Sequence, residues 1–140
     1  MASFFTMAHS GWRYLVVLAL AVAIIKYLIG WLGKGKWTSL DNTINRVTPI
    51  VVEVQWLLGL ITWIVGSWWS SSLRSVAWEH PITLTVAVAV MSILSGRAKR
   101  ATTDQGKFQL ALIAYLVTAI LVVLGIWLAI GSFNVFGNRA

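Results

Sequence analysis

Two histidines, His9 and His80, are the only imidazole side chains in this chain of 140 residues. Each precedes a long apolar run. Imidazole nitrogens are frequent ligands of haem iron, and two imidazoles at one depth can bind the same iron from opposite sides. Arg13 lies four residues after His9, on the same helix face, and Glu79 directly precedes His80. We therefore expect Arg13 and Glu79 beside any such centre.

Other chemistry finds little support in the residue types. Histidines near helix ends also form caps or meet lipid headgroups, so His9 and His80 alone leave a structural role open. The absence of cysteine excludes disulfides, thiolate metal sites and covalent haem attachment. The two histidines and four acidic residues do not form the pattern of a serine–histidine–acid triad or of a hydrolytic metal site. We expect no catalytic activity of the chain's own.

Four apolar runs must position these residues. Hydrophobic residues make up 59% of the chain, and they gather in runs close to the roughly 20 residues that a membrane-spanning helix needs. The runs cover about residues 12–32, 49–68, 81–96 and 110–133. The sequence therefore predicts an all-α fold, a single domain over residues 1–140 that forms an integral membrane four-helix bundle in the lipid bilayer.

Polar and turn-forming residues predict where the helices end. Ser10 is placed to cap the first helix. Residues 33–37 contain two glycines and two lysines and should end it. Ser39 or Asp41 could start a short amphipathic helix before Pro49, where the second helix begins or an earlier helix kinks.

The net charge of +7 is distributed unevenly. The loop between the second and third runs contains a single basic residue, Arg74. Because basic loops stay cytoplasmic, we expect both termini on the periplasmic side of a bacterial inner membrane. Basic residues at a membrane surface do not indicate a nucleic-acid partner. They lie in or beside the first and third loops: Lys34, Lys36, Arg46, Arg97, Lys99, Arg100 and Lys107. Without a charged start or a cleavage motif, no cleaved signal peptide is expected.

Charged residues inside the apolar runs predict two interhelical ion pairs. An ionised group in hydrocarbon tends to face the bundle and find a partner. Lys26 and Glu53 should pair in the cytoplasmic leaflet, and Arg13 and Glu79 near the periplasmic surface. These pairs would join the helices. Alternatively, Glu53 transfers protons, or Arg13 binds a cofactor carboxylate or a quinone oxygen.

The second run carries one narrow face of small and polar residues. Gln55, Gly59, Thr62 and Gly66 recur at spacings of four, three and four. Such a face allows close approach of a neighbouring helix. Most tryptophans lie at predicted helix ends, as in an aromatic belt. Trp56 and Trp63 lie within the second run and are available for packing or cofactor contact.

Four sequence segments carry a resemblance to a family of small bacterial four-helix membrane proteins, some described as cytochrome b-like. The segments are HSGWRYLVVL from His9, QWLLGLITW from Gln55, EHPITL from Glu79 and GRAKRATTDQGKF from Gly96. The resemblance covers nearly the whole chain. It implies functional roles for His9, Arg13, Gln55, Glu79 and His80. Its members often carry histidine where this chain has Glu53, which removes one potential ligand here.

Two functions follow as expectations. The first is a small accessory transmembrane subunit of a larger bacterial electron-transport complex, respiratory or photosynthetic, that stabilises the assembly against other membrane subunits. The alternative is a b-type cytochrome-like electron carrier, with one haem b held by His9 and His80. Its partners would be quinone or a periplasmic redox protein. A transporter is less expected, since no inverted repeat is visible.

Overall fold

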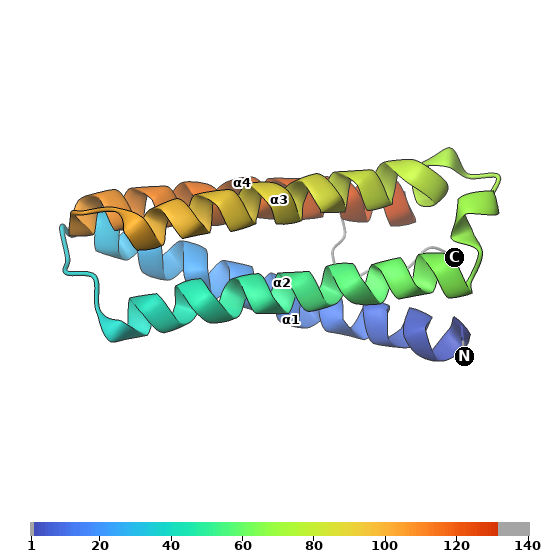
Figure 1. Cartoon of the computed structure of the whole chain (residues 1–140), viewed down its shortest axis with the longest axis horizontal. Coiled ribbons are helices and arrows are strands. Elements are labelled where there is room, and N and C mark those ends of the chain that lie inside the picture. Colours follow the sequence, from blue (N-terminus) through green and yellow to red (C-terminus); the bar gives the residue numbers. More distant parts are fainter. Residues whose placement is uncertain (1, 132–140) are drawn as a thin grey trace.

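The computed structural model describes residues 2–131, and every regular element in this part of the chain is helical (Figure 1). The all-α prediction is confirmed, and the long helices have the length and composition to cross a membrane. A 3-10 turn η1 (Trp68–Ser70) and a π-helical turn η2 (Ser75–Glu79) precede the third long helix. The long helices are α1 (Ala2–Leu32), α2 (Ser39–Val65), α3 (His80–Arg100) and α4 (Asp104–Ile130).

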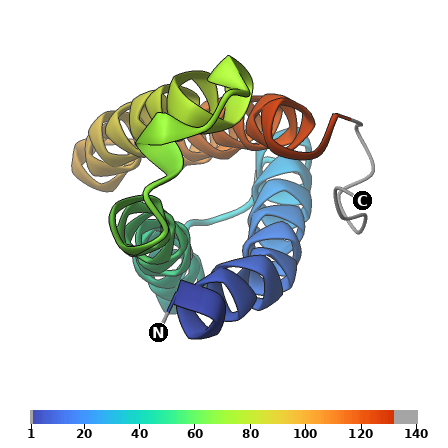
Figure 2. The ribbon, with the colours of Figure 1, turned by 90° about the vertical axis from the view of Figure 1, so that its right-hand side faces the viewer.

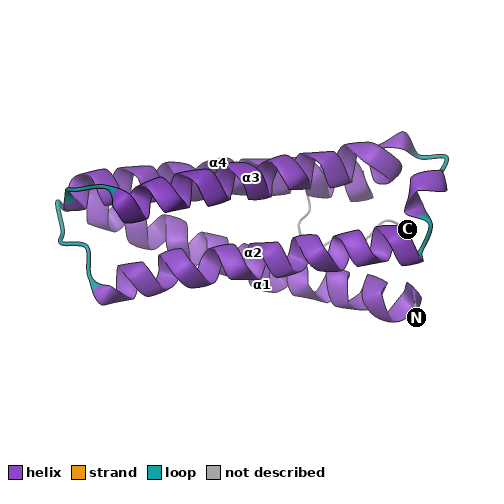
Figure 3. Ribbon diagram, in the orientation of Figure 1, coloured by secondary structure: helices purple, strands orange, loops and turns teal. Residues whose placement is uncertain are grey.

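The helices form two antiparallel hairpins, α1–α2 and α3–α4, which close into a ring when viewed along the bundle (Figure 2). α3 packs most closely on α4 and α1 on α2, whereas α2 and α3 meet least among the neighbouring long helices. Residues 33–38 and 101–103 connect the helices at one end, called the basic end here (Figure 3). The start of α1, the end of α4 and residues 66–79 form the other end, called the terminal end.

Local sequence explains the turn between α1 and α2. The amide of Gly33 donates to the carbonyl of Ile29, and the amide of Gly35 donates to the carbonyl of Gly30, both at 2.9 Å. These bonds satisfy the last carbonyls of α1, which ends at Leu32 as predicted. Asp41 then stabilises the first turn of α2, because its Oδ2 accepts a hydrogen bond from the backbone amide of Thr38 at 2.9 Å.

The helices extend beyond the predicted spans. α1 begins at Ala2, so Ser10 lies inside the helix and its prediction as a cap was wrong. No proline interrupts this segment, and the helix continues through Gly11. With its π-helical turn, the third span covers residues 75–100. The fourth begins at Asp104, and the predicted residues 132–133 lie outside the described part of the chain.

Pro49 lies within α2, which neither begins nor breaks there. Proline has no amide hydrogen, so the carbonyl four residues earlier, on Asn45, loses its helical partner. The hydroxyl of Tyr115 on α4 lies 3.2 Å from this carbonyl and 2.7 Å from Asn45 Oδ1. The single hydroxyl proton of Tyr115 is shared between this carbonyl and Asn45 Oδ1, so it partly replaces the amide hydrogen that residue 49 lacks.

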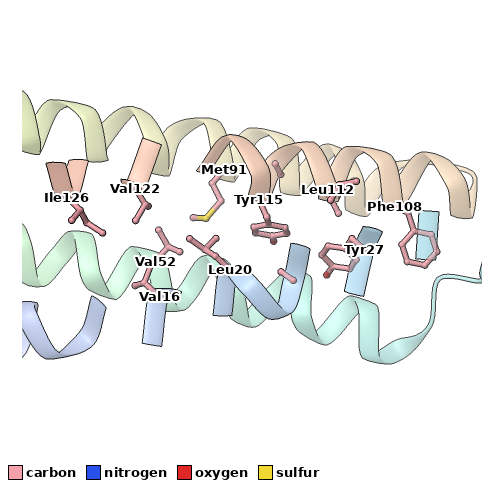
Figure 4. Packing of buried hydrophobic residues seen from close by; sticks show 14 residues of the cluster. Val16, Leu20, Tyr27, Val52, Met91, Phe108, Leu112, Tyr115, Val122 and Ile126 are labelled. Carbon is pink, nitrogen blue, oxygen red and sulfur yellow. The ribbon is translucent and has the colours of Figure 1, made fainter. Parts of the chain in front are cut away.

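The core changes along the bundle (Figure 4). Towards the basic end, the large rings of Tyr27, Phe108 and Tyr115 are fully buried, and Tyr27 stacks on Tyr115 and lies tilted against Phe108. Towards the terminal end, Val16 and Val122 occupy the equivalent place between the helices. Valine fills less space than an aromatic ring, so this composition leaves room inside the terminal half of the bundle.

Candidate functional site

His9 on α1 and His80 on α3 meet inside the terminal half. Their ring centres are 6.2 Å apart, and the ring planes lie nearly perpendicular, at 78°. α1 begins seven residues before His9, which places this ring about 10 Å inside the helix at 1.5 Å per residue. The π-helical turn likewise precedes His80. Helical residues therefore precede both histidines, whereas the predicted spans began only after them, at residues 12 and 81.

Each imidazole is held by a backbone carbonyl of the helix that completes its hairpin. His9 Nδ1 lies 3.3 Å from the carbonyl oxygen of Gln55 on α2. His80 Nδ1 lies 2.6 Å from the carbonyl oxygen of Gly125 on α4. A carbonyl only accepts hydrogen bonds, so the neutral rings carry their proton on Nδ1. The unprotonated Nε2 of each ring keeps its lone pair for a ligand.

A cavity of about 610 Å³ contains both histidines in its wall. Its volume falls in the range of roughly 300–1,000 Å³ that is typical of small-molecule and cofactor sites. All four long helices contribute to the lining, which is mostly apolar. Val16, Val52, Val122 and Ile126 line the cavity, and Leu20 and Met91 lie between these side chains and the ring of Tyr115 (Figure 4).

Apart from the histidines and tryptophans, few polar side chains line the cavity, and most of them belong to α1 and α2. They are Thr6, Ser10 and Arg13 of α1, Gln55 and Thr62 of α2, and Thr85 of α3. Among the described lining residues, Arg13 alone carries a fixed charge, and its Nη2 also donates to the hydroxyl of Tyr14 at 3.3 Å. A single cation in an apolar wall favours a ligand that bears an anionic or carbonyl oxygen.

Two tryptophans of α2 form hydrogen bonds with α3 and with the π-helical turn η2 that precedes it. Trp56 Nε1 donates to Thr85 Oγ1 at 2.9 Å, and Trp63 Nε1 donates to the carbonyl of Ala77 at 2.7 Å. Both line the cavity, in agreement with their prediction as residues available for packing or cofactor contact. Trp78, one of the tryptophans at a predicted helix end, also lines the cavity.

No known protein family, curated protein or solved structure matches this chain. The resemblance to cytochrome b-like membrane proteins therefore stays a prediction from the sequence. The geometry of the cavity and of the two imidazoles is what indicates a function.

The predicted Lys26–Glu53 ion pair is wrong. Lys26 Nζ binds Asp41 Oδ1 at 2.7 Å, and the Asp41 side chain is fully buried. Glu53 is exposed, and Ser92 Oγ lies 3.5 Å from its Oε1. The start of α2 explains the difference: Glu53 lies about 21 Å along α2 from Ser39, whereas Lys26 lies only about 9 Å from the end of α1. Asp41 is therefore the acid at the depth that Lys26 reaches.

The predicted partner of Glu79 was also wrong. Glu79 Oε1 lies 3.4 Å from Arg74 Nε, and both side chains are substantially exposed at the terminal end. It pairs there rather than with Arg13, and it does not line the cavity. Adjacent residues of a helical turn point in different directions, so Glu79 points to Arg74 and not into the cavity with His80. Arg13 and Gln55 thus remain at the cavity, and Glu79 does not.

Sequence reasoning missed the groups that hold the rings. The carbonyls of Gln55 and Gly125 carry no sequence signal, because every residue has a carbonyl. Gly59 did carry one, as part of the small-residue face of α2. A methyl group at Gly59 would lie 2.9 Å from Cε1 of His9, so this face accommodates an imidazole as well as a neighbouring helix.

Proposed function

We propose that this chain is a multi-pass membrane haem protein of the b type, an electron carrier with His9 and His80 as the axial ligands of one haem. The observation that carries the proposal is the 6.2 Å separation of the two ring centres. Two imidazoles that bind one metal ion from opposite sides would have ring centres about 6 Å apart, because each metal–nitrogen bond is about 2 Å long and each ring centre lies about 1 Å beyond its nitrogen.

The hydrogen bonds of the two rings support the same role. Metal-bound histidines usually donate their other ring nitrogen to a carbonyl or carboxylate, which fixes the ring and raises its basicity. Gln55 and Gly125 supply such carbonyls. The described residues contain no group of three or more His, Asp or Glu side chains arranged for a metal ion. A metal centre here would therefore be held by the two imidazoles, and the remaining ligands would come from the cofactor itself.

The cavity suits the rest of a haem. Its mostly apolar wall matches a large planar ring, and Arg13 offers one cation for a propionate. Bound haem b supplies an iron that exchanges one electron. The chain's own residues hold the ring nitrogens in place, exclude water with apolar side chains and neutralise a carboxylate. If His9 and His80 both held the iron, neither would leave a position open for a substrate, and the site would favour electron transfer.

The position of the cavity implies the side of electron exchange. The basic residues gather at the basic end, which the positive-inside rule assigns to the cytoplasm. The cavity lies in the opposite half, so it would exchange electrons with quinone or with a periplasmic redox partner. Membership of a larger electron-transport complex is compatible with this role. A purely structural subunit, however, has no need of two held imidazoles beside a cavity.

Substitution of each histidine tests the proposal. We expect His9→Ala and His80→Ala each to abolish the low-spin haem spectrum of the purified protein, because one axial position is lost. Glu53→Gln is the matched control, since Glu53 is exposed and does not line the cavity. Visible spectra of protein expressed with sufficient haem provide the measurement. A low-spin spectrum that survives both histidine substitutions would contradict the assignment.

A further inference from the structure

Gly59 of α2 lies directly against the imidazole of His9. A methyl group at this position would be 2.9 Å from Cε1, 3.3 Å from Nδ1 and 3.6 Å from Nε2 of that ring. Carbon atoms in favourable contact are about 3.5–4.0 Å apart, so an alanine would press on the ring. Glycine is the residue that leaves this ring in its present place.

The same stretch of α2 also binds the ring. His9 Nδ1 bonds to the carbonyl of Gln55, which is one helical turn before Gly59. The imidazole thus lies along the α2 backbone, held at the carbonyl of Gln55 and fitted over the hydrogen of Gly59. Both its distance from α2 and its direction depend on the absence of a side chain at residue 59.

The second glycine near a histidine differs. A methyl group at Gly125 would meet the Cδ2 atom of Leu84 first and would lie 3.6 Å from Nδ1 of His80, an ordinary contact. Gly125 therefore makes room for a leucine, whereas Gly59 makes room for an imidazole. A leucine side chain can move by rotating its own bonds, but the His9 ring is tied to a backbone carbonyl.

We infer that Gly59 is a positioning residue, which orients the His9 imidazole and thereby determines how firmly His9 binds the haem iron. The inference rests on the proposed function. Gly59 would act through His9, without any contact of its own with the haem. Alanine favours a helix more than glycine does, so a purely helical role for residue 59 would be served better by alanine.

Carbon monoxide is a probe of His9 ligation. In full-length, haem-loaded protein in detergent, a reduced iron with two firmly bound histidines leaves no position for carbon monoxide. We expect Gly59→Ala to raise the carbon monoxide-reactive fraction of the reduced protein by about tenfold, because crowding of the ring weakens one axial bond. The electron paramagnetic resonance g values of the oxidised protein should shift with it.

Gly11→Ala is the matched control. Gly11 is also a helical glycine near His9, and a methyl group there meets nothing within 4 Å. We expect it to keep the carbon monoxide reactivity and the g values of the unmodified protein. If Gly59→Ala behaves in the same way, the inference is overturned while the proposed function stands. If the unmodified protein binds no haem, the proposed function fails first.

A second variant covers the outcome in which Gly59→Ala does not accumulate. Combining it with His9→Gly removes the ring that the new methyl group meets, and free imidazole can be added as a replacement ligand. Recovery of folded haem protein in this double variant attributes the defect to the His9 ring and supports the inference. Continued failure, with His9→Gly alone folding normally, would assign Gly59 to helix packing and overturn it.

Discussion

Asp41 is fully buried, yet it is surrounded by donors. Its Oδ1 binds Lys26 Nζ at 2.7 Å, and its Oδ2 accepts from the backbone amide and the hydroxyl of Thr38 at 2.9 and 3.1 Å. A buried carboxylate is tolerated only when such partners replace its water. Asp41 therefore joins the end of α1 to the start of α2.

Removal of Lys26 should weaken this junction. We expect Lys26→Met to lower the free energy of unfolding by about 2 kcal/mol, because the buried carboxylate keeps its Thr38 bonds but loses its charged partner. Lys36→Met is the control, since Lys36 is exposed in the same turn region and should change stability little. Denaturant unfolding in detergent micelles compares the two. Equal stability of both variants would show that the Lys26–Asp41 contact contributes nothing.

Which residues of α1 and α2 lie opposite each other could not be predicted from the sequence, for a physical reason. Lys26 was predicted to need an acid in α2, and it has one. Which acid it reaches depends on where α2 begins, and that depends on the Thr38–Asp41 cap rather than on the apolar run after Pro49. Likewise, an alternating helix direction predicted that His9 and His80 share one end. The carbonyls that hold them depend on the rotation of each helix, which only packing determines.

At the level of the helices, Tyr115 of α4 compensates for Pro49 of α2. The tyrosine hydroxyl lies within hydrogen-bond distance of both the carbonyl and the side-chain oxygen of Asn45. Asn45 Nδ2 in turn donates a hydrogen bond to the carbonyl of Ser95 on α3 at 3.1 Å. Three helices thus share one buried polar cluster in the aromatic half of the core. Such a cluster fixes the positions of the helices because unpaired polar groups are costly away from water.

A double-mutant cycle tests this compensation. Tyr115→Phe alone should cost about 1–3 kcal/mol of unfolding free energy, because Asn45 loses a buried donor. In a Pro49→Ala background, residue 49 regains an amide hydrogen for the Asn45 carbonyl, so the cost of Tyr115→Phe should be smaller. Thermal unfolding of the four proteins gives the coupling. Strict additivity would mean that Tyr115 does not act for the missing amide.

For the whole molecule, charge gives the bundle a direction. The two ends differ strongly in basic residues, and this difference predicts a cytoplasmic basic end and a periplasmic terminal end. Four membrane-crossing helices were predictable because their apolar runs are long. The cavity was not, because it results from valines and glycines meeting across different helices, as Val16, Val52 and Gly59 do.

Cysteine labelling tests this orientation directly, because the chain has no cysteine of its own. Ser72 and Thr102 are both exposed, at the terminal and basic ends respectively. We expect a membrane-impermeant thiol reagent applied from the periplasmic side to label Ser72→Cys and to spare Thr102→Cys. Lysed cells serve as the control in which both react. Labelling of Thr102→Cys alone in intact cells would contradict the predicted orientation and place the basic end on the periplasmic side.

The most direct test of the account is a reduced-minus-oxidised visible spectrum of the gently solubilised full-length protein, with its copurifying proteins identified. Two held imidazoles beside a cavity of about 610 Å³ predict a low-spin haem b signal that stays with this chain after its partners are removed. A flat spectrum from stable, haem-supplied protein that copurifies with a larger assembly would contradict the electron-carrier role and leave a structural subunit.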